Sequence, residues 1–291
     1  MSQSIKNAST SWSILLFLGF VVLFASPGFA QEKYDGVYGD GGNRFVLATG
    51  SPGELGLLKA LGEAFAQQEK ATLLWKKAGS GEALKLLKEK KVDAIMVHDP
   101  EGEKKAITEG WAMGHTLIGS NEFFIVGPTD DPAGISSVKS AVEAYKKIAT
   151  AHAKFFSRGD NSGTHKKELA VWKKAGIEPK GDWYQITGGF MKATLKRAND
   201  EKGYFMTDSS TWIMEKTNLP DLKVLFRGDK FLVNTYHALC QPQQATPGAA
   251  LAAKFGEFLV SKQGQEIIRS YGKGEYGQSL YDDAAYARQY E

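Results

Sequence analysis

The sequence predicts an α/β protein of two lobes that share a ligand between them. From residue 44 onward, short apolar runs typical of buried strands alternate with helical patterns, as in mainly parallel sheets covered on both faces. The segment 128–134, PTDDPAG, interrupts this alternation, and a second α/β series follows it. Ligands of open parallel sheets bind beyond the carboxyl ends of the strands, so two such lobes would hold a ligand in their cleft.

The first series follows a glycine-rich lead. Leucine and phenylalanine recur at helical spacing between the apolar runs, as at Leu58, Leu61 and Phe65. The expected strands are 44–49, 71–78, 93–98 and 121–127, and the expected helices are 53–68 and 81–92.

The second series repeats the alternation and ends in a long helical segment. Its expected strands are 154–158, 203–208, 221–226 and 231–240, and its expected helices are 141–151, 165–176, 190–200 and 248–272. We expect the chain to cross between the lobes near 121–128 and 231–240. This assigns residues 31–127 and 236–291 to lobe 1 and residues 128–235 to lobe 2.

The first thirty residues have the layout of a secretory signal peptide. Lys6 supplies a positive charge, residues 12–25 are apolar and uncharged, and small residues precede Ala30. The apolar run is shorter than the roughly 20 residues that a bilayer-spanning helix needs. We therefore expect cleavage near Ala30, a periplasmic location and no stable membrane insertion of the mature chain.

Cysteine content and charge exclude some further classes. The single cysteine, Cys240, cannot form an internal disulfide, so the exported chain must be stabilised by its core. The formal net charge of the full chain is only +3. So small a basic excess argues against nucleic acid as a partner.

The loop 157–165, SRGDNSGTH, lies between a predicted strand and a predicted helix. The first N–H groups of a helix have no internal partners, and the helix dipole makes that end positive. Arg158 adds a permanent cation, Ser162 and Thr164 add hydroxyl donors, and Gly163 lets the backbone approach a ligand. This combination favours a bound oxyanion. A purely structural alternative is an ordinary loop with an N-cap hydroxyl.

Asp160 in the same loop opposes anion binding, because a carboxylate repels an anion. It must either point away and orient Arg158 or the loop amides, or accept a proton from a protonated ligand.

Two other loops have the same position between a strand and a helix. In ATGSPGE, residues 48–54, Ser51 and Glu54 have capping-box spacing, so a cap and a ligand site explain Ser51 equally well. In KAGSGEAL, residues 77–84, Ser80 lies between two glycines. The convergence of three such loops favours anion binding over capping alone.

Catalysis and metal binding are the competing interpretations. A hydrolase or transferase would use Ser162 with His165, but the sequence places no acidic residue to orient that histidine. The histidines show no metal-ligand spacing such as HExxH; they are His98, His115, His152, His165 and His237. We therefore predict no enzyme activity, no metal site and no cofactor.

Several stretches together resemble tungstate-binding proteins, the extracytoplasmic components of ABC-type oxyanion importers. The long stretch SRGDNSGTHKKELAVWKKAGIEPKGDWY carries most of the resemblance. VDAIMVHDPEGEKKAITEGW, NEFFIVGPTDDPAGI and YFMTDSSTW match in the same order. The Arg-x-Asp-x-Ser-Gly-Thr pattern is also similar, more distantly, to that of phosphate-binding proteins.

This resemblance implies a periplasmic-binding-protein-like fold of type II, with two crossover strands and a tetrahedral dianion in the cleft. It implies an ABC permease of the inner membrane as partner. On matching positions, lobe 2 would bind through Arg158, Ser162, Gly163 and Thr164. Lobe 1 would contribute Thr49, Gly50, Ser51, Ser80 and Gly81. The chain departs from the family pattern around Gly50, which shortens a hydroxyl-rich loop, and at Phe190.

The protonation state of each candidate anion at neutral pH helps to identify the ligand. Tungstate and molybdate are fully deprotonated at neutral pH and need only donors, whereas phosphate keeps a proton that a carboxylate can accept. Asp160 and Glu54 turned inward would favour phosphate; turned outward, they favour tungstate or molybdate. The alternatives are a small organic acid bound to Arg158, or a sensory rather than a transport role.

Overall fold

The strands of the described part of the chain form one continuous hydrogen-bonded sheet. The computed structural model describes residue 1 and residues 33–291, so the predicted signal peptide and its cleavage point lie outside the described residues. The strand order is β1-β3-β2-β4-β10-β5-β8-β6-β7, and β9 and β11 also pair with β5. We call the strands before β5 in this order the first sheet and those after it the second sheet.

The first sheet has a parallel centre. Strand β2 pairs in parallel with β3 and with β4, while β1 and β10 run antiparallel at either side. Its strands are β1 (Gly36–Tyr38), β2 (Asn43–Thr49), β3 (Ala71–Lys77), β4 (Ala94–Val97), β10 (Val233–Cys240), and β11 (Asp282–Asp283), which pairs with β5.

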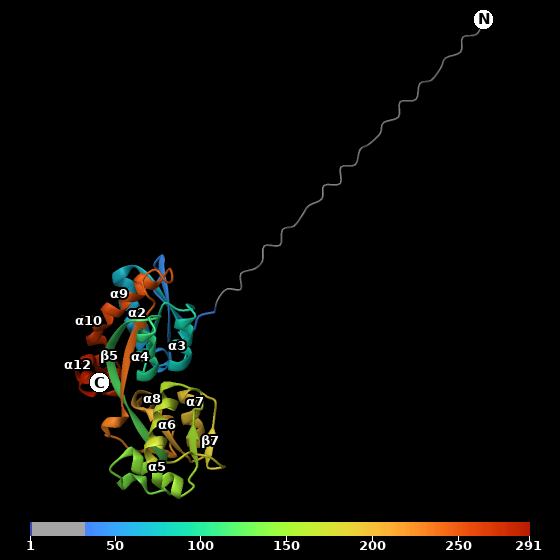
Figure 1. The fold of residues 1–291 in the computed structure, drawn as a ribbon, viewed down its shortest axis with the longest axis vertical. Coiled ribbons are helices and arrows are strands. Elements are labelled where there is room, and N and C mark those ends of the chain that lie inside the picture. Colours follow the sequence, from blue (N-terminus) through green and yellow to red (C-terminus); the bar gives the residue numbers. More distant parts are fainter. Residues whose placement is uncertain (2–32) are drawn as a thin grey trace. The chain divides into compact units, whose positions relative to one another are not determined.

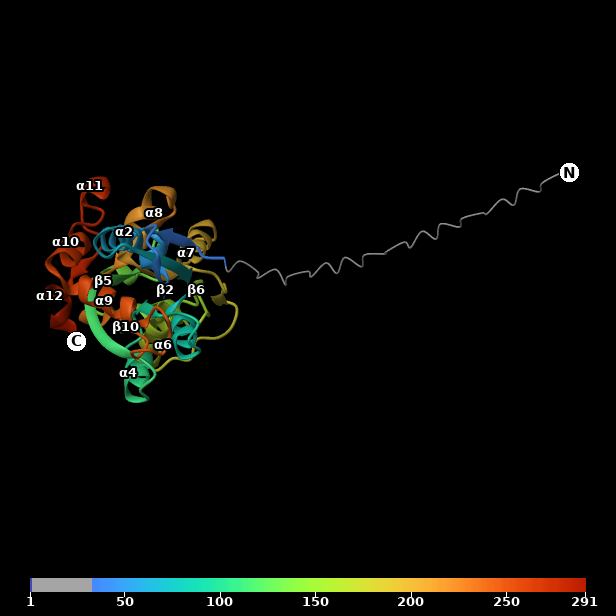
Figure 2. The same ribbon diagram turned by 90° about the horizontal axis from the view of Figure 1, so that it is seen from above.

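Helices cover both faces of the first sheet, as Figures 1 and 2 show. On one face, phenylalanines of the sheet and of two helices pack together, with Phe45, Phe65 and Phe255 in mutual contact. That face carries α2 (Leu57–Glu69), α9 (Ala249–Val260) and α10 (Lys262–Ser270), and the opposite face carries α3 (Ser80–Lys88) and α4 (Pro100–Thr108).

The second sheet is built in the same way around β6, β7 and β8. Its outer strands β6 and β7 are parallel to each other, and β6 is parallel to β8. The strands are β6 (Phe155–Ser157), β7 (Tyr184–Ile186), β8 (Tyr204–Asp208) and β9 (Leu222–Phe226). One face carries α5 (Ala141–Thr150) and α6 (Gly163–Ala175), and the other carries α7 (Met191–Asp200) and α8 (Ser209–Glu215).

Strand β5 (Met113–Pro128) belongs to both sheets and connects them, as Figure 1 shows. Its first part pairs with β10 as far as Glu122, and its second part pairs with β8 from Phe123. The chain therefore crosses between the sheets within the predicted segment 121–128. The predicted α/β class is confirmed.

Two predicted helices are each interrupted. The helix expected at 53–68 is divided into α1 (Ser51–Glu54) and α2, because Gly56 lies in the left-handed region at φ 86°. The helical segment expected at 248–272 is divided at Ser261, which is extended and accepts a bond from Gly264 N as the N-cap of α10.

Some elements were not expected from the apolar pattern. Helix α4 has only two buried residues, Glu103 and Ala106, so no apolar stripe marks it. The sequence does indicate where this helix begins, because Asp99 is its N-cap and Pro100 its first residue. Strand β7, helix α8, α11 (Lys273–Tyr276) and α12 (Ala284–Ala287) are also additional. None of the helices in the described part of the chain is both long and apolar enough to cross a membrane.

Candidate functional site

The three predicted loops meet at one small cavity between the two sheets. Two of the loops follow β2 and β3 of the first sheet, and the third follows β6 of the second sheet. The lining residues are Thr49, Gly50, Ser51, Pro52, Gly79, Ser80, Met96, His98, Arg158, Ser162, Phe190 and Tyr236.

Most of the predicted binding residues line this cavity. From the first sheet these are Thr49, Gly50, Ser51 and Ser80, and from the second sheet Arg158 and Ser162. Gly81, Gly163 and Thr164 do not line it, and their predicted contact with a ligand stays a prediction.

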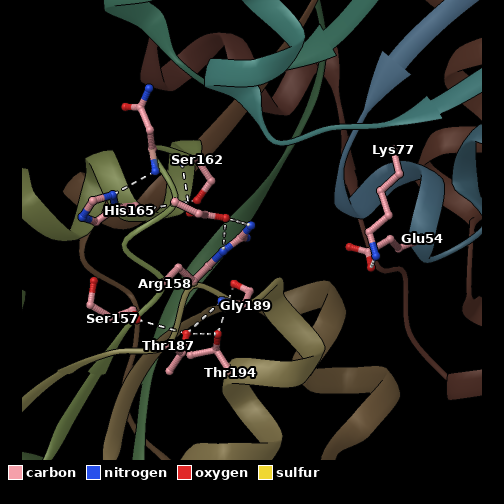
Figure 3. Close-up of polar contacts among 11 residues, drawn as sticks. Glu54, Lys77, Ser157, Arg158, Ser162, His165, Thr187, Gly189 and Thr194 are labelled. Carbon is pink, nitrogen blue, oxygen red and sulfur yellow. Dashed lines mark hydrogen bonds and ion pairs between the residues drawn. The ribbon is translucent and has the colours of Figure 1, made fainter.

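Arg158 is held in the cavity wall by Asp160. The Nε and Nη2 atoms of this arginine both donate to Oδ2 of Asp160, at 3.0 and 2.5 Å, as drawn in Figure 3. The other oxygen, Oδ1, accepts from Ser162 N at 3.1 Å. Asp160 thus orients both the arginine and a loop amide, one of the two roles that the sequence left open. No hydrogen bond joins Nη1 of Arg158 to any described residue, so its two hydrogens remain for a ligand.

The same contacts keep Asp160 ionised. Burial is the largest effect and alone would raise the pKa of Asp160. The positive charge of Arg158 and the hydrogen bonds from Ser162 and Arg158 outweigh burial and lower that pKa below its ordinary value. The carboxylate therefore cancels the arginine charge in part without facing the cavity.

Two serine hydroxyls of the cavity lining each accept a backbone N–H group. Ser80 Oγ accepts from His98 N at 3.2 Å, and Ser162 Oγ accepts from His165 N at 3.3 Å as the N-cap of α6. Because Ser80 Oγ already accepts a backbone N–H, its own O–H is available to point into the cavity. The Ser162 hydroxyl also lies close enough to Asp160 to help lower the pKa of that carboxyl. Ser162 both caps α6 and lines the cavity, so its capping and ligand interpretations are compatible.

The other two hydroxyls of the first sheet differ from each other. Thr49 Oγ1 donates its hydrogen to Met96 O at 2.8 Å, so this side chain cannot also donate to an anion. Among the described residues, no hydrogen-bond partner is found for Ser51 Oγ, and no backbone acceptor is found for the N–H groups of Gly50 and Ser51. This loop can therefore contribute the Ser51 hydroxyl and two amides.

Glu54 is turned away from the cavity and paired with a cation. Its Oε1 lies 2.5 Å from Lys77 Nζ. In Figure 3 these two side chains point toward each other, on the opposite side of the view from Arg158. Lys77 Nζ also lies 4.2 Å from the ring centroid of Phe190. Arg158 Cζ lies 5.3 Å from the centroid of the same ring, so both cations are within range of a cation–π contact with Phe190. No acidic side chain among the described residues lines the cavity.

His98 lines the cavity and was not predicted. Its Nδ1 lies 2.8 Å from Asn234 Oδ1, and Asn234 Nδ2 donates in turn to Asn121 Oδ1. This network assigns the ring proton to Nδ1. Burial lowers the pKa of His98 to about 4, so the ring is neutral at neutral pH. The position of His98, directly after β4, is the signal that sequence reasoning could have used.

Two glycines permit the two sheets to approach each other beside the cavity. A Cβ atom on Gly163 would lie 2.6 Å from His98 O, and one on Gly81 would lie 2.6 Å from Asn161 O. Both contacts involve backbone atoms, which cannot swing aside as a flexible side chain can. These glycines therefore set the distance between the loop of Arg158 and the loops of the first sheet.

The alternative interpretation, a hydrolase or transferase that uses Ser162 with His165, is not supported by the contacts of the histidine. His165 Nδ1 accepts from Asn161 N at 3.1 Å, so the imidazole is engaged by the loop backbone and not by the Ser162 hydroxyl. A general base must lie within hydrogen-bond reach of the proton it removes.

Comparison with known proteins agrees with this arrangement. A family model described as a PBP superfamily domain matches residues 31–263. The crystal structure of the tungstate ABC transporter from Geobacter sulfurreducens is 36% identical, with a TM-score of 0.72 over 80% of this chain and 100% of that chain. For the tungstate-binding protein TupA from Desulfovibrio alaskensis G20 the identity is 35% and the TM-score 0.70, over 83% and 98% of the two chains.

A curated relative gives the same result from sequence. The tungstate-binding protein TupA of Peptoclostridium acidaminophilum is 34% identical over 244 residues, which cover 82% of this chain and 85% of the relative. The fold and the cavity at the strand ends define a solute-binding protein of the PBP superfamily. Within that superfamily, the chain belongs to the family of the TupA tungstate-binding proteins.

Proposed function

We propose that this protein is the extracytoplasmic solute-binding component of an ABC importer and that it captures tungstate, with molybdate as a second ligand. The single observation that carries the proposal is the convergence of three loops, from two sheets, on one small cavity lined by an arginine and several hydroxyls. Of the related structures named above, one is of a tungstate ABC transporter and the other is of a tungstate-binding protein.

Within this proposal each group has a defined role. Arg158 supplies the charge and the Nη1 donors, while Ser80 and Ser162 donate through their oriented hydroxyls. Ser51, with the amides of Gly50 and Ser51, completes the side of the first sheet. Donors preorganised in this way bind an anion with little reorganisation and with only one cation removed from water.

The absence of an acidic lining residue among the described residues favours a fully deprotonated dianion. Asp160 is engaged by Arg158 and by Ser162 N, and Glu54 is engaged by Lys77. Neither carboxylate is turned inward to accept the proton that phosphate keeps. This supports tungstate or molybdate over phosphate.

The organisation of the chain follows from the same proposal. Residues 31–127 with 236–291 form lobe 1, residues 128–235 form lobe 2, and the anion is bound between them. The chain is exported to the periplasm after cleavage near Ala30 and delivers its anion to a permease in the inner membrane. It has no catalytic role, which the engagement of His165 by Asn161 N supports.

A thermal-shift panel tests the ligand. Tungstate, molybdate, sulfate, phosphate and small carboxylates are each added to the purified protein at neutral pH. A ligand present at 100 times its Kd stabilises the folded state by about 2.7 kcal/mol, which raises Tm visibly. We expect the largest rise with tungstate or molybdate. A larger rise with phosphate or a carboxylate would reassign the ligand, and no rise with any of them would refute oxyanion binding.

Replacing Gly163 by alanine is expected to weaken tungstate binding about tenfold, because overpacking of this kind typically costs about 1–3 kcal/mol. The added Cβ would meet His98 O at 2.6 Å and push the start of α6 away from the first sheet. The control is Gly256→Ala, where a Cβ meets no atom within 4 Å. Calorimetric titration of both variants measures the effect, and equal affinities in the two would contradict the packing argument.

A further inference from the structure

A second group of polar side chains lies outside the anion cavity. Glu103 of α4, His115 of β5 and His237 of β10 bring three ligand atoms within 4.8 Å of one another. Glu103 Oε2 lies 3.0 Å from His115 Nε2 and 2.9 Å from His237 Nδ1. Glu103 and His237 are buried, whereas the side chain of His115 is 38% exposed. None of the three lines the anion cavity.

Within this group, Nδ1 of His237 has no hydrogen bond of good geometry. His237 Nδ1 is buried and, despite its 2.9 Å distance from Glu103 Oε2, has no hydrogen-bond partner of acceptable geometry in the described chain. An unpaired buried polar atom costs about 1–3 kcal/mol. A metal ion bound by Nδ1 and by Glu103 Oε2 together would satisfy both atoms.

The outer partners of these residues are those that a metal site requires. His237 Nε2 lies 2.7 Å from Glu291 Oε1, which places the ring proton on Nε2 and leaves the lone pair of Nδ1 for an ion. Glu103 Oε1 accepts from Asp99 N at 2.6 Å, which leaves Oε2 for the ion. A histidine that binds a metal usually donates its other N–H to a carboxylate, and a ligating carboxylate is itself hydrogen-bonded.

We propose that Glu103, His115 and His237 bind a divalent transition-metal ion, and that Zn²⁺ is the ion that fits best. Two imidazole nitrogens and one carboxylate oxygen form a recognised zinc ligand set, with a fourth position open to water. Mg²⁺ and Ca²⁺ prefer oxygen ligands and are not expected to bind. The site joins α4, β5 and β10, and it is independent of the proposed anion ligand.

Binding requires one side chain to turn. The rings of His115 and His237 are stacked, with centroids 4.0 Å apart and planes inclined by 13°. A metal ion lies close to the plane of each imidazole that binds it, so two parallel rings cannot both bind the same ion. His115 is the exposed member of the pair and can rotate, which ends the stacking while His237 and Glu103 keep their outer partners.

Zinc titration tests the proposal directly. Untagged protein, free of a polyhistidine sequence and of oxyanions, is titrated calorimetrically with ZnCl₂ and, in parallel, with MgCl₂. We expect one zinc ion per chain, no binding of magnesium, and at least about tenfold weaker zinc binding by His115→Asn. The matched control is His152→Asn, which changes an exposed histidine outside the group and should bind zinc as the unaltered protein does.

Two further measurements separate the outcomes. Glu103→Gln should also lose zinc affinity, and Co²⁺ added in place of zinc should give the visible absorption of a four-coordinate site. His115→Asn should bind tungstate unchanged and Arg158→Ala should bind zinc unchanged, so failure of one proposal leaves the other intact. Zinc affinity that is absent from the unaltered protein, or equal in it and in His115→Asn, would overturn the metal site.

Discussion

Replacing Arg158 by alanine is expected to weaken tungstate binding by at least about 30-fold. Arg158 is the only arginine or lysine among the lining residues of the cavity, and its side chain is 5% exposed. Removing one partner of a buried, hydrogen-bonded charge pair costs about 2–5 kcal/mol, and each 1.4 kcal/mol is a factor of ten in affinity. Calorimetric titration of the variant with tungstate measures the loss.

The effect has two components that a second variant separates. Arg158→Lys keeps the positive charge but loses the planar set of N–H donors, so we expect it to bind with intermediate affinity. The matched control is Arg197→Ala, which removes an arginine outside the cavity that pairs with Glu201. Arg158→Ala with full tungstate affinity and an unchanged Tm would remove the anion site from this cavity.

Loss of Arg158 also affects Asp160, and this must be distinguished from loss of binding. Without the arginine, Asp160 keeps Ser162 as its hydrogen-bond partner but loses its only charged one in the part of the chain that the structure describes. The double variant Arg158→Ala with Asp160→Asn removes the unpaired charge, so its stability should recover in part while its tungstate affinity stays low. Recovery of affinity in the double variant would mean that Asp160, not the lost donors, caused the effect.

The strands were predictable because their apolar runs are short and bounded by polar residues. Strand β8 at Tyr204–Asp208 differs by one residue from the expected 203–208. The spacing of apolar residues did not predict where a helix is interrupted. The leucines keep their helical spacing across Gly56, although the backbone enters the left-handed region there. Periodicity reports which face is buried and not whether the helix is continuous.

The lining of the cavity was predictable where the donors lie in a strand-to-helix loop. Arg158, Ser162 and Ser80 carry donors at strand-to-helix junctions, and such junctions bring donors together whatever the details of packing. Phe190 and Tyr236 reach the cavity only because of how the two sheets pack, which no local pattern encodes. The group around Glu103 is beyond motif analysis for the same reason, since it joins three elements far apart in the sequence.

Replacing Glu168 by glutamine is expected to stabilise the protein above neutral pH and to have little effect in acid. Glu168 of α6 is 1% exposed, and its Oε1 accepts from Tyr184 Oη at 2.7 Å and from Trp172 Nε1 at 3.3 Å. Burial is the dominant effect and raises the pKa of Glu168 to about 7, although these hydrogen bonds and the nearby Ser157 oppose the rise.

The sign of the pH dependence follows from the raised pKa. Below about pH 4.5 the carboxyl is protonated in both the folded and the unfolded chain, so its contribution to stability is fully present. As the pH rises, the unfolded chain releases the proton first, and the contribution is lost as the pH approaches and passes 7. Glutamine resembles the protonated form at every pH, so its own contribution does not change with pH.

The difference in unfolding free energy between Glu168→Gln and the unaltered protein should therefore be near zero at pH 4.5. It should grow to at most about 3 kcal/mol by pH 8. Urea unfolding at pH 4.5, 6 and 8 measures this difference. Because the two proteins share all other titratable groups, the effects of those groups cancel in the difference. Glu178→Gln, at an exposed position just beyond the end of α6, should give a small difference at every pH. A flat profile for Glu168→Gln would show that the buried carboxyl does not retain its proton in the folded state.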